Sequence, residues 1–116
     1  MKISEKIRGD VAILTLSGEL MSGPEVAPFQ DHIKKLASEG VKKVVVDFSR
    51  VRWFGSAMLG VLTASLTTLR GEGGDLRLTG VTRKIESILM VTQLANIFTT
   101  LDTVDRAVES FADQDV

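Results

Sequence analysis

Apolar residues near the start of the chain follow two different periods. In KISEKIRGDVAILTLSGEL, residues 2–20, apolar and polar positions alternate around the turn-forming Arg8-Gly9-Asp10, which predicts an antiparallel hairpin. A helical period follows Ser22-Gly23-Pro24 and predicts a helix from about Glu25 to Gly40. The apolar face of this helix is formed by Val26, Phe29, Ile33 and Leu36.

Two residues inside this predicted helix carry expectations of their own. Pro28 cannot donate a backbone hydrogen bond, so we expect it in the first turn, where N–H groups have no helical partner. His32 lies among Asp31, Lys34 and Lys35, so we expect a solvated side chain and not a ligand.

Strands and helices alternate through the rest of the chain. We expect strands at residues 41–48, at 75–81 and around Ile97 and Phe98. A helix is expected at 57–70, with GEGGD as its stop, and another opens at Thr82 with Ile85, Ile88 and Leu89 buried. Asp102 or Thr103 caps a last helix through Ala107 to Phe111.

This order predicts an α/β fold. A hairpin followed by alternating helices and strands indicates a mixed, mostly parallel sheet of about four to five strands with four helices. We expect a single domain over residues 1–116, with an ordered core of about 2–111 and a frayed tail, ADQDV.

The composition narrows the chemistry. The chain has no Cys and one His, which excludes disulfides, thiol nucleophiles and histidine-rich metal sites. Its 14 Lys and Arg nearly balance its 15 Asp and Glu. A nucleic-acid-binding protein usually has a strong excess of basic residues, so this balance argues against a nucleic-acid partner. No apolar run approaches the roughly 18 residues of a membrane span, and MKISEKIRGD lacks the apolar segment of a signal peptide. We therefore expect a cytoplasmic protein that is not an enzyme, uses no cofactor or metal, and has no membrane span or direct nucleic-acid partner.

The stretch VVVDFSRVRWFGSAMLGVL, residues 44–62, places Ser56 between a predicted strand and a predicted helix. A Ser at such a junction is a natural helix N-cap, and the edge of a sheet is accessible to partners. The stretch is not G-x-S-x-G and His32 lies on another helix, so a catalytic Ser is not expected. Trp53 either fills the core, which we favour, or anchors an interface.

Several segments in the correct order resemble one known family. They are LSGELM, the stretch around Ser56, Gly73-Gly74, DLRLTGV and TQLANIFTTLDTVDRAV. Together they resemble the STAS domain of bacterial anti-sigma factor antagonists over nearly the whole chain, from about Lys2 to Phe111.

The resemblance implies a partner-switching mechanism. The unmodified domain binds an anti-sigma factor that is also a serine kinase, which releases a sigma factor for transcription. Phosphorylation of the first Ser in the family's D-S-S-G motif breaks the complex, and a phosphatase resets it; Ser56 matches that Ser. We expect a monomer or weak dimer. The expected partner-binding residues are Met21, Ser22, Gly55, Ser56, Ala57, Met58 and Leu59.

The chain departs from the family pattern at five positions. Gly55 replaces the Asp before the Ser, Ala57 the second Ser, Met58 the next Gly, Met21 the Asp after GEL, and Gln93 the Gly of the closing motif. Met21 and Met58 either fill the interior or form a docking patch. Ser56 is either a phosphorylated switch or an unmodified cap in a STAS scaffold of a larger signalling or transport assembly. A nucleotide- or lipid-binding role is allowed by the family, but no residue here supports it.

Overall fold

The computed structural model describes residues 1–112, so the expected frayed tail lies outside the described residues except for Ala112, which ends a helix. The strands are β1 (Lys2–Arg8), β2 (Val11–Leu20), β3 (Lys43–Phe54), β4 (Asp75–Thr79) and β5 (Thr99–Leu101). The helices are α1 (Gly23–Ser38), α2 (Ser56–Gly71), α3 (Arg83–Val91) and α4 (Val104–Ala112), with a 3-10 turn, η1 (Leu94–Asn96).

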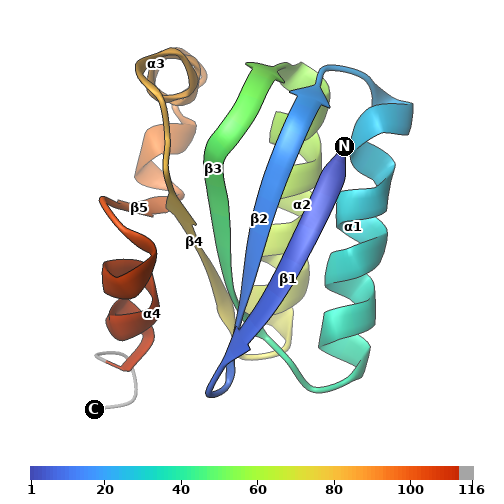
Figure 1. Cartoon of the computed structure of the whole chain (residues 1–116), viewed down its shortest axis with the longest axis vertical. Helices are drawn as coiled ribbons and strands as arrows, with labels where there is room; N and C mark the ends of the chain where they lie inside the picture. The colour runs from blue at the N-terminus through green and yellow to red at the C-terminus, as the bar shows by residue number, and fades with distance from the viewer. Residues whose placement is uncertain (113–116) are drawn as a thin grey trace.

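The strands form one sheet in the order β1-β2-β3-β4-β5 (Figure 1). β1 and β2 are an antiparallel hairpin, and every later neighbour pairs in parallel. Figure 1 shows α1 and α2 side by side along the sheet, with α4 apart from them beside β4 and β5. The predicted α/β fold is confirmed: a mixed, mostly parallel sheet, four helices and an N-terminal hairpin.

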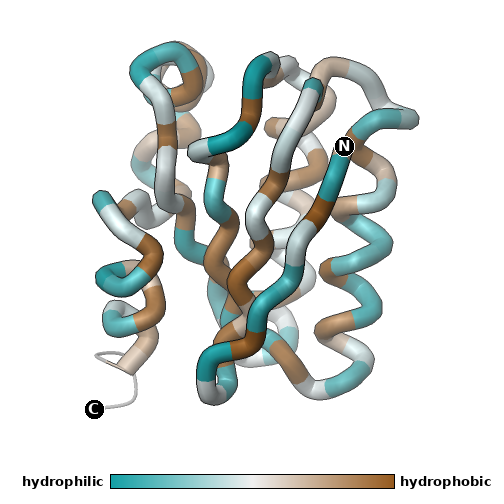
Figure 2. The backbone as a smooth tube through the Cα atoms, in the orientation of Figure 1, coloured by the Kyte–Doolittle hydropathy of each residue, from teal (hydrophilic) through white to brown (hydrophobic). Residues whose placement is uncertain are grey.

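Alternate side chains of β2 and β3 point to opposite faces of the sheet, and each face has its own hydrophobic core. Leu14 points into the large core beneath α1 and α2, whereas Ile13 points into a smaller one beneath α4. Figure 2 shows the apolar segments of α4 on its sheet side and the hydrophilic ones outside. Burial on both faces explains why these strands are nearly continuous apolar runs. The smaller core consists of Val11, Ile13, Val45, Ala107 and Phe111.

β3 continues to Phe54, past its predicted end at Phe48. Two β-bulges interrupt the alternation of apolar and polar residues in this last part of the strand. Each bulge adds one residue to β3, so Val51, between the two bulges, points to the face opposite the one that alternation predicts, and the second bulge restores the original alternation at Phe54. Phe48, Val51 and Phe54 therefore all face the large core although they are three residues apart. The pairs around the bulges are Thr15 with Asp47 and Ser17 with Arg50, then Gly18 with Val51 and Glu19 with Trp53.

The first helix begins earlier than predicted. α1 starts at Gly23 because the N–H of Ser22, its N-cap, donates to Glu25 Oε1 at 3.0 Å, half of a capping box. Pro28 consequently lies in the second turn, not the first. It is exposed, and its ring removes the helical hydrogen bond to the carbonyl of Pro24.

The last strand and helix also shift slightly from the prediction. The expected strand around Ile97 and Phe98 is observed at Thr99–Leu101, and Phe98 is instead a buried anchor just before it. Of the two candidate caps for α4, Thr103 is the one used, since its Oγ1 accepts the N–H of Arg106 at 3.1 Å.

Arg77 forms a buried ion pair within β4 and also links α4 to the sheet. Arg77 on β4 is only 4% exposed, and its Nη1 donates to Asp75 Oδ2 at 2.5 Å. Its Nε donates to Ser110 Oγ at 2.9 Å, and the guanidinium lies 4.5 Å above the ring of Phe111. Burial raises the pKa of Asp75, but hydrogen bonds from Arg77 and the N–H of Leu76 outweigh it, so the pKa is held below its ordinary value.

Candidate functional site at the start of helix α2

The sheet edge at the carboxyl ends of β2 and β3 positions Ser56. The N–H of Gly55 donates to the carbonyl of Leu20 at 2.9 Å, which ties the start of α2 to the end of β2. Gly55 is extended, with φ −126°, and serves as the N-cap, so Ser56 is the first residue of the helix. The prediction that Ser56 is the N-cap is therefore wrong. Its exposed side chain lies beside backbone N–H groups that have no helical partner.

Two departures from the family pattern contact each other at this edge. A β-carbon on Gly55 would lie 3.2 Å from the carbonyl oxygen of Met21 and 3.3 Å from its Sδ. Met21 therefore packs closely over Gly55, and its own side chain is 51% exposed. The pair places flexible apolar surface next to Ser56.

The predicted partner-binding residues fall into two groups. Met21, Ser22 and Ser56 are exposed, and Gly55 and Ala57 are half-buried. Met58 is completely buried and Leu59 nearly so. Met58 is therefore a core filler, whereas Met21 is available to a partner. Ser22 also has a structural role, because it caps α1.

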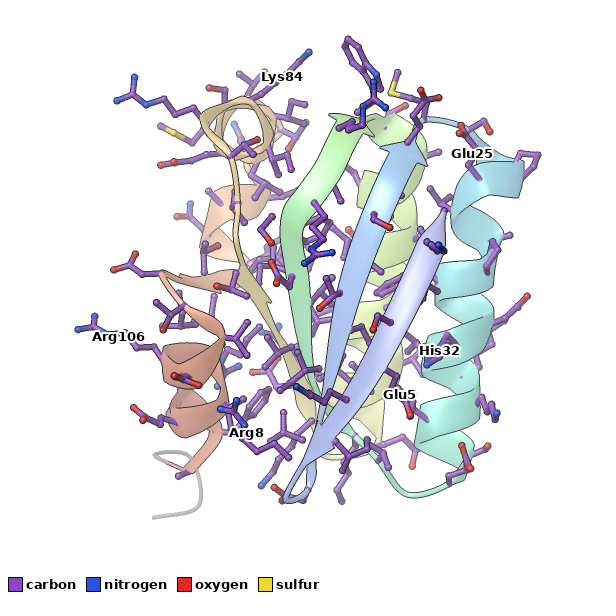
Figure 3. All side chains as sticks on the ribbon, in the orientation of Figure 1. Glu5, Arg8, Glu25, His32, Lys84 and Arg106 are labelled. Atoms are coloured by element: carbon purple, nitrogen blue, oxygen red, sulfur yellow. The ribbon has the colours of Figure 1, made fainter. Side chains whose placement is uncertain are left out.

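Trp53 is a surface residue, and the expectation that it fills the core is wrong. Its side chain is 47% exposed because the second bulge of β3 pairs it with Glu19, on the outer face of the sheet. Lys84, the second residue of α3, places Nζ 4.8 Å from the centre of the Trp53 ring, a cation–π contact. Figure 3 labels Lys84 on α3. This contact links β3 to α3, and the sequence carried no signal for it.

We call the exposed side chains of Met21, Trp53 and Ser56 the junction surface. The three residues come from the ends of adjacent strands and the start of α2, at one edge of the sheet. An exposed Trp and Met beside a hydroxyl are suited to protein binding, because aromatic anchors dominate interface energetics.

Nothing in the described part of the chain gives Ser56 a catalytic partner. His32 is half-buried, and its Nε2 lies 2.6 Å from Glu5 Oε1, so it joins α1 to β1 (Figure 3). The expectation of a solvated His32 is therefore wrong. Within residues 1–112, no group of three or more His, Cys, Asp or Glu could hold a metal ion. No helix of that part is long and apolar enough to cross a membrane.

The mixed sheet with an N-terminal hairpin and four helices, with Ser56 exposed at the start of α2, agrees with the family resemblance read from the sequence. Residues 3–101 match the family model described as "Mlab, STAS domain", so the chain belongs to the STAS domain family. The resemblance read from the sequence is thus confirmed.

Solved structures of anti-sigma factor antagonists share this fold. A Thermotoga maritima protein assigned as an anti-sigma factor antagonist is 28% identical, with a TM-score of 0.88, covering 95% of this chain and 94% of its own. An anti-sigma factor antagonist from Mycobacterium paratuberculosis is 22% identical, with a TM-score of 0.82 and coverages of 96% and 93%. The Bacillus cell fate determinant SpoIIAA, in its phosphorylated form, is 15% identical, with a TM-score of 0.74 and coverages of 94% and 98%.

Proposed function

We propose that this chain is a cytoplasmic, single-domain regulator that acts as an anti-sigma factor antagonist. It binds an anti-sigma factor that is also a serine kinase, through the junction surface. The observation that supports this best is the exposed Ser56 at the first residue of α2, flanked by exposed Met21. Family membership and the anti-sigma factor antagonist fold agree with the assignment.

Phosphorylation of Ser56 would switch this binding off. A phosphate adds roughly −1.5 to −2 charges at neutral pH. The helix N-terminus accommodates an anion through its unpaired N–H groups, so the fold stays intact. A partner surface formed on Met21 and Trp53 would have to desolvate that charge, which disfavours the complex. A phosphatase then restores the binding form.

A direct test uses the cognate kinase. The protein is incubated with ATP and the kinase-type anti-sigma factor, and its intact mass is measured. We expect one added phosphate on the parent chain and none on Ser56→Ala. The Ser4→Ala variant, which removes an exposed Ser on β1, should take up phosphate normally. No phosphate on the parent, or phosphate that survives Ser56→Ala, would rule out the switch.

Binding measurements separate the charge of the phosphate from its position. Ser56→Glu should weaken partner binding at least tenfold and leave thermal stability nearly unchanged. Thr67→Glu provides the matched control, because it adds the same charge to an exposed position about three turns further along α2. Equal loss of binding in both variants would mean that net charge, and not the junction surface, governs the complex.

A STAS scaffold without a switch is the second candidate. The contact between Met21 and Gly55 favours it, because neither residue supplies the acidic group that the family places beside its phospho-acceptor. A partner that requires Trp53 but binds Ser56→Ala and Ser56→Glu equally well would establish this role in a larger signalling or transport assembly.

A further inference from the structure

A concave site borders α3 and shares no residue with the junction surface. It is a cavity of about 690 Å³ at the carboxyl ends of β4 and β5, the edge where open α/β sheets usually bind ligands. We call it the α3 pocket. Residues that line it include Val81, Glu86, Leu89, Met90, Phe98 and Asp102.

The lining combines an apolar floor with negative charge. Leu89 and Phe98 are buried side chains of the core that also border the cavity. Glu86 and Asp102 are exposed carboxylates from α3 and from the residue after β5, and no Lys, Arg or His lines the pocket. Arg106 Nη1 lies 3.9 Å from Asp102 Oδ2 with both side chains mostly exposed, so this contact neutralises little.

Apolar surface continues outside the cavity. Met90 at the rim is 63% exposed, and Ile97 just beyond η1 is 40% exposed. These are two of the six large hydrophobic side chains left exposed in the described chain, and they occur within eight residues of sequence. A ligand confined to the cavity would leave Ile97 in water, whereas an extended segment of a partner would cover it.

We propose that the α3 pocket is a second protein-binding site, for a partner segment in which apolar residues alternate with Lys or Arg. An apolar side chain enters between Leu89, Met90 and Phe98, and neighbouring cations pair with Glu86 and Asp102. Charge complementarity selects this segment over an acidic one, because an acidic peptide would set like charges against both carboxylates.

This site goes beyond the junction surface and is separable from it. On α3, Lys84 lies on the side next to Trp53. Glu86 and Met90 are four residues apart and share the other side, next to the pocket. The domain can therefore hold two partner segments at once, on opposite flanks of one helix.

Fluorescence anisotropy with a labelled nine-residue peptide of alternating Leu and Arg tests the site on the full chain. The double variant Glu86→Gln, Asp102→Asn should weaken binding about fivefold, as expected for two partly exposed ion pairs. Met90→Gln should weaken binding through the apolar anchor. The matched control, Glu39→Gln with Glu109→Gln, removes two exposed carboxylates elsewhere and should bind as the parent does. Circular dichroism confirms that each variant is folded.

Amide chemical-shift mapping gives an independent readout. Peptide-induced shifts should fall on Val81, Leu89 and Leu101 and should persist in Ser56→Glu, whatever the outcome for the antagonist function. A Leu–Glu peptide that binds equally well would overturn the proposal. So would equal loss of affinity in the control pair, or shifts that map outside the pocket. Hexylammonium binding as tightly as the peptide would show a small-molecule site instead and would equally overturn it.

Discussion

Replacing Gly80 by Ala should destabilise the domain by about 3 kcal/mol, the sum of a backbone cost and a steric cost. Gly80 follows β4 with φ +66°, a left-handed conformation that costs other residues roughly 1–2 kcal/mol. A β-carbon at this position would lie 2.7 Å from the backbone nitrogen of Ser49 and closer still to Asp47 Oδ1. The methyl group therefore has no room.

The steric part follows from what the methyl group displaces. Asp47 Oδ1 accepts the N–H of Ser49 at 2.9 Å within the first bulge of β3. Losing that hydrogen bond costs about 1 kcal/mol, and pushing β3 aside instead costs roughly 1–3 kcal/mol. Gly9 is a matched control, because its φ is +64° and a β-carbon there meets nothing within 4 Å. Gly9→Ala should lose only the backbone cost of about 1 kcal/mol.

Urea unfolding followed by circular dichroism measures both variants. The difference of about 2 kcal/mol corresponds to a midpoint lower by about 1 M urea in Gly80→Ala than in Gly9→Ala. If the two variants unfold at the same urea concentration, close packing at Gly80 does not contribute and the reasoning fails. A changed dependence of the unfolding free energy on urea concentration would instead show that the denatured state was altered.

Four further variants test other parts of the structure. Gln93→Gly should stabilise the domain by about 0.5–1 kcal/mol in a thermal melt, because Gln93 has φ 63°; a loss of stability would contradict this strain. Asp75→Asn should cost about 3 kcal/mol at pH 7 by leaving Arg77 buried without its charge partner. The lowered pKa of Asp75 stabilises the fold above about pH 4, and that contribution is lost as the pH falls through the folded value, so the difference from the parent must shrink in acid. Met58→Ala should lose about 2–5 kcal/mol and Met21→Ala less than about 0.5, measured by chemical denaturation; similar losses would refute their different burial.

Elements with a strong local signal were predictable from the sequence. Val44, Val45 and Val46 are consecutive and all buried, and such a β-branched run is typical of a strand covered on both faces. The helical spacing around Phe29 and Ile33 likewise predicted the buried face of α1. Both signals are visible within one element, which is why they survive without knowledge of the neighbours.

Features that depend on distant neighbours were not predictable. Trp53 pairs with Glu19 on the outer face and is 47% exposed, and only the pairing of β3 with β2 shows that register. The spacing of three between Phe48, Val51 and Phe54 was the one trace of the two bulges of β3 in the sequence. Arg77 is a polar residue of β4, yet its Nε donates to Ser110 Oγ, 33 residues further along the chain, so α4 buries it.

The same limit applies at Ser56, where two substitutions that look like separate losses form one contact. Gly55 lacks a side chain where Met21 packs, so an Asp restored at position 55 alone would meet the sulfur and carbonyl oxygen of Met21 at about van der Waals distance or closer. Restoring the acidic surroundings therefore requires both positions to change together. As they stand, they make the junction surface apolar, and an apolar surface is the kind that a phosphate on Ser56 would disturb most.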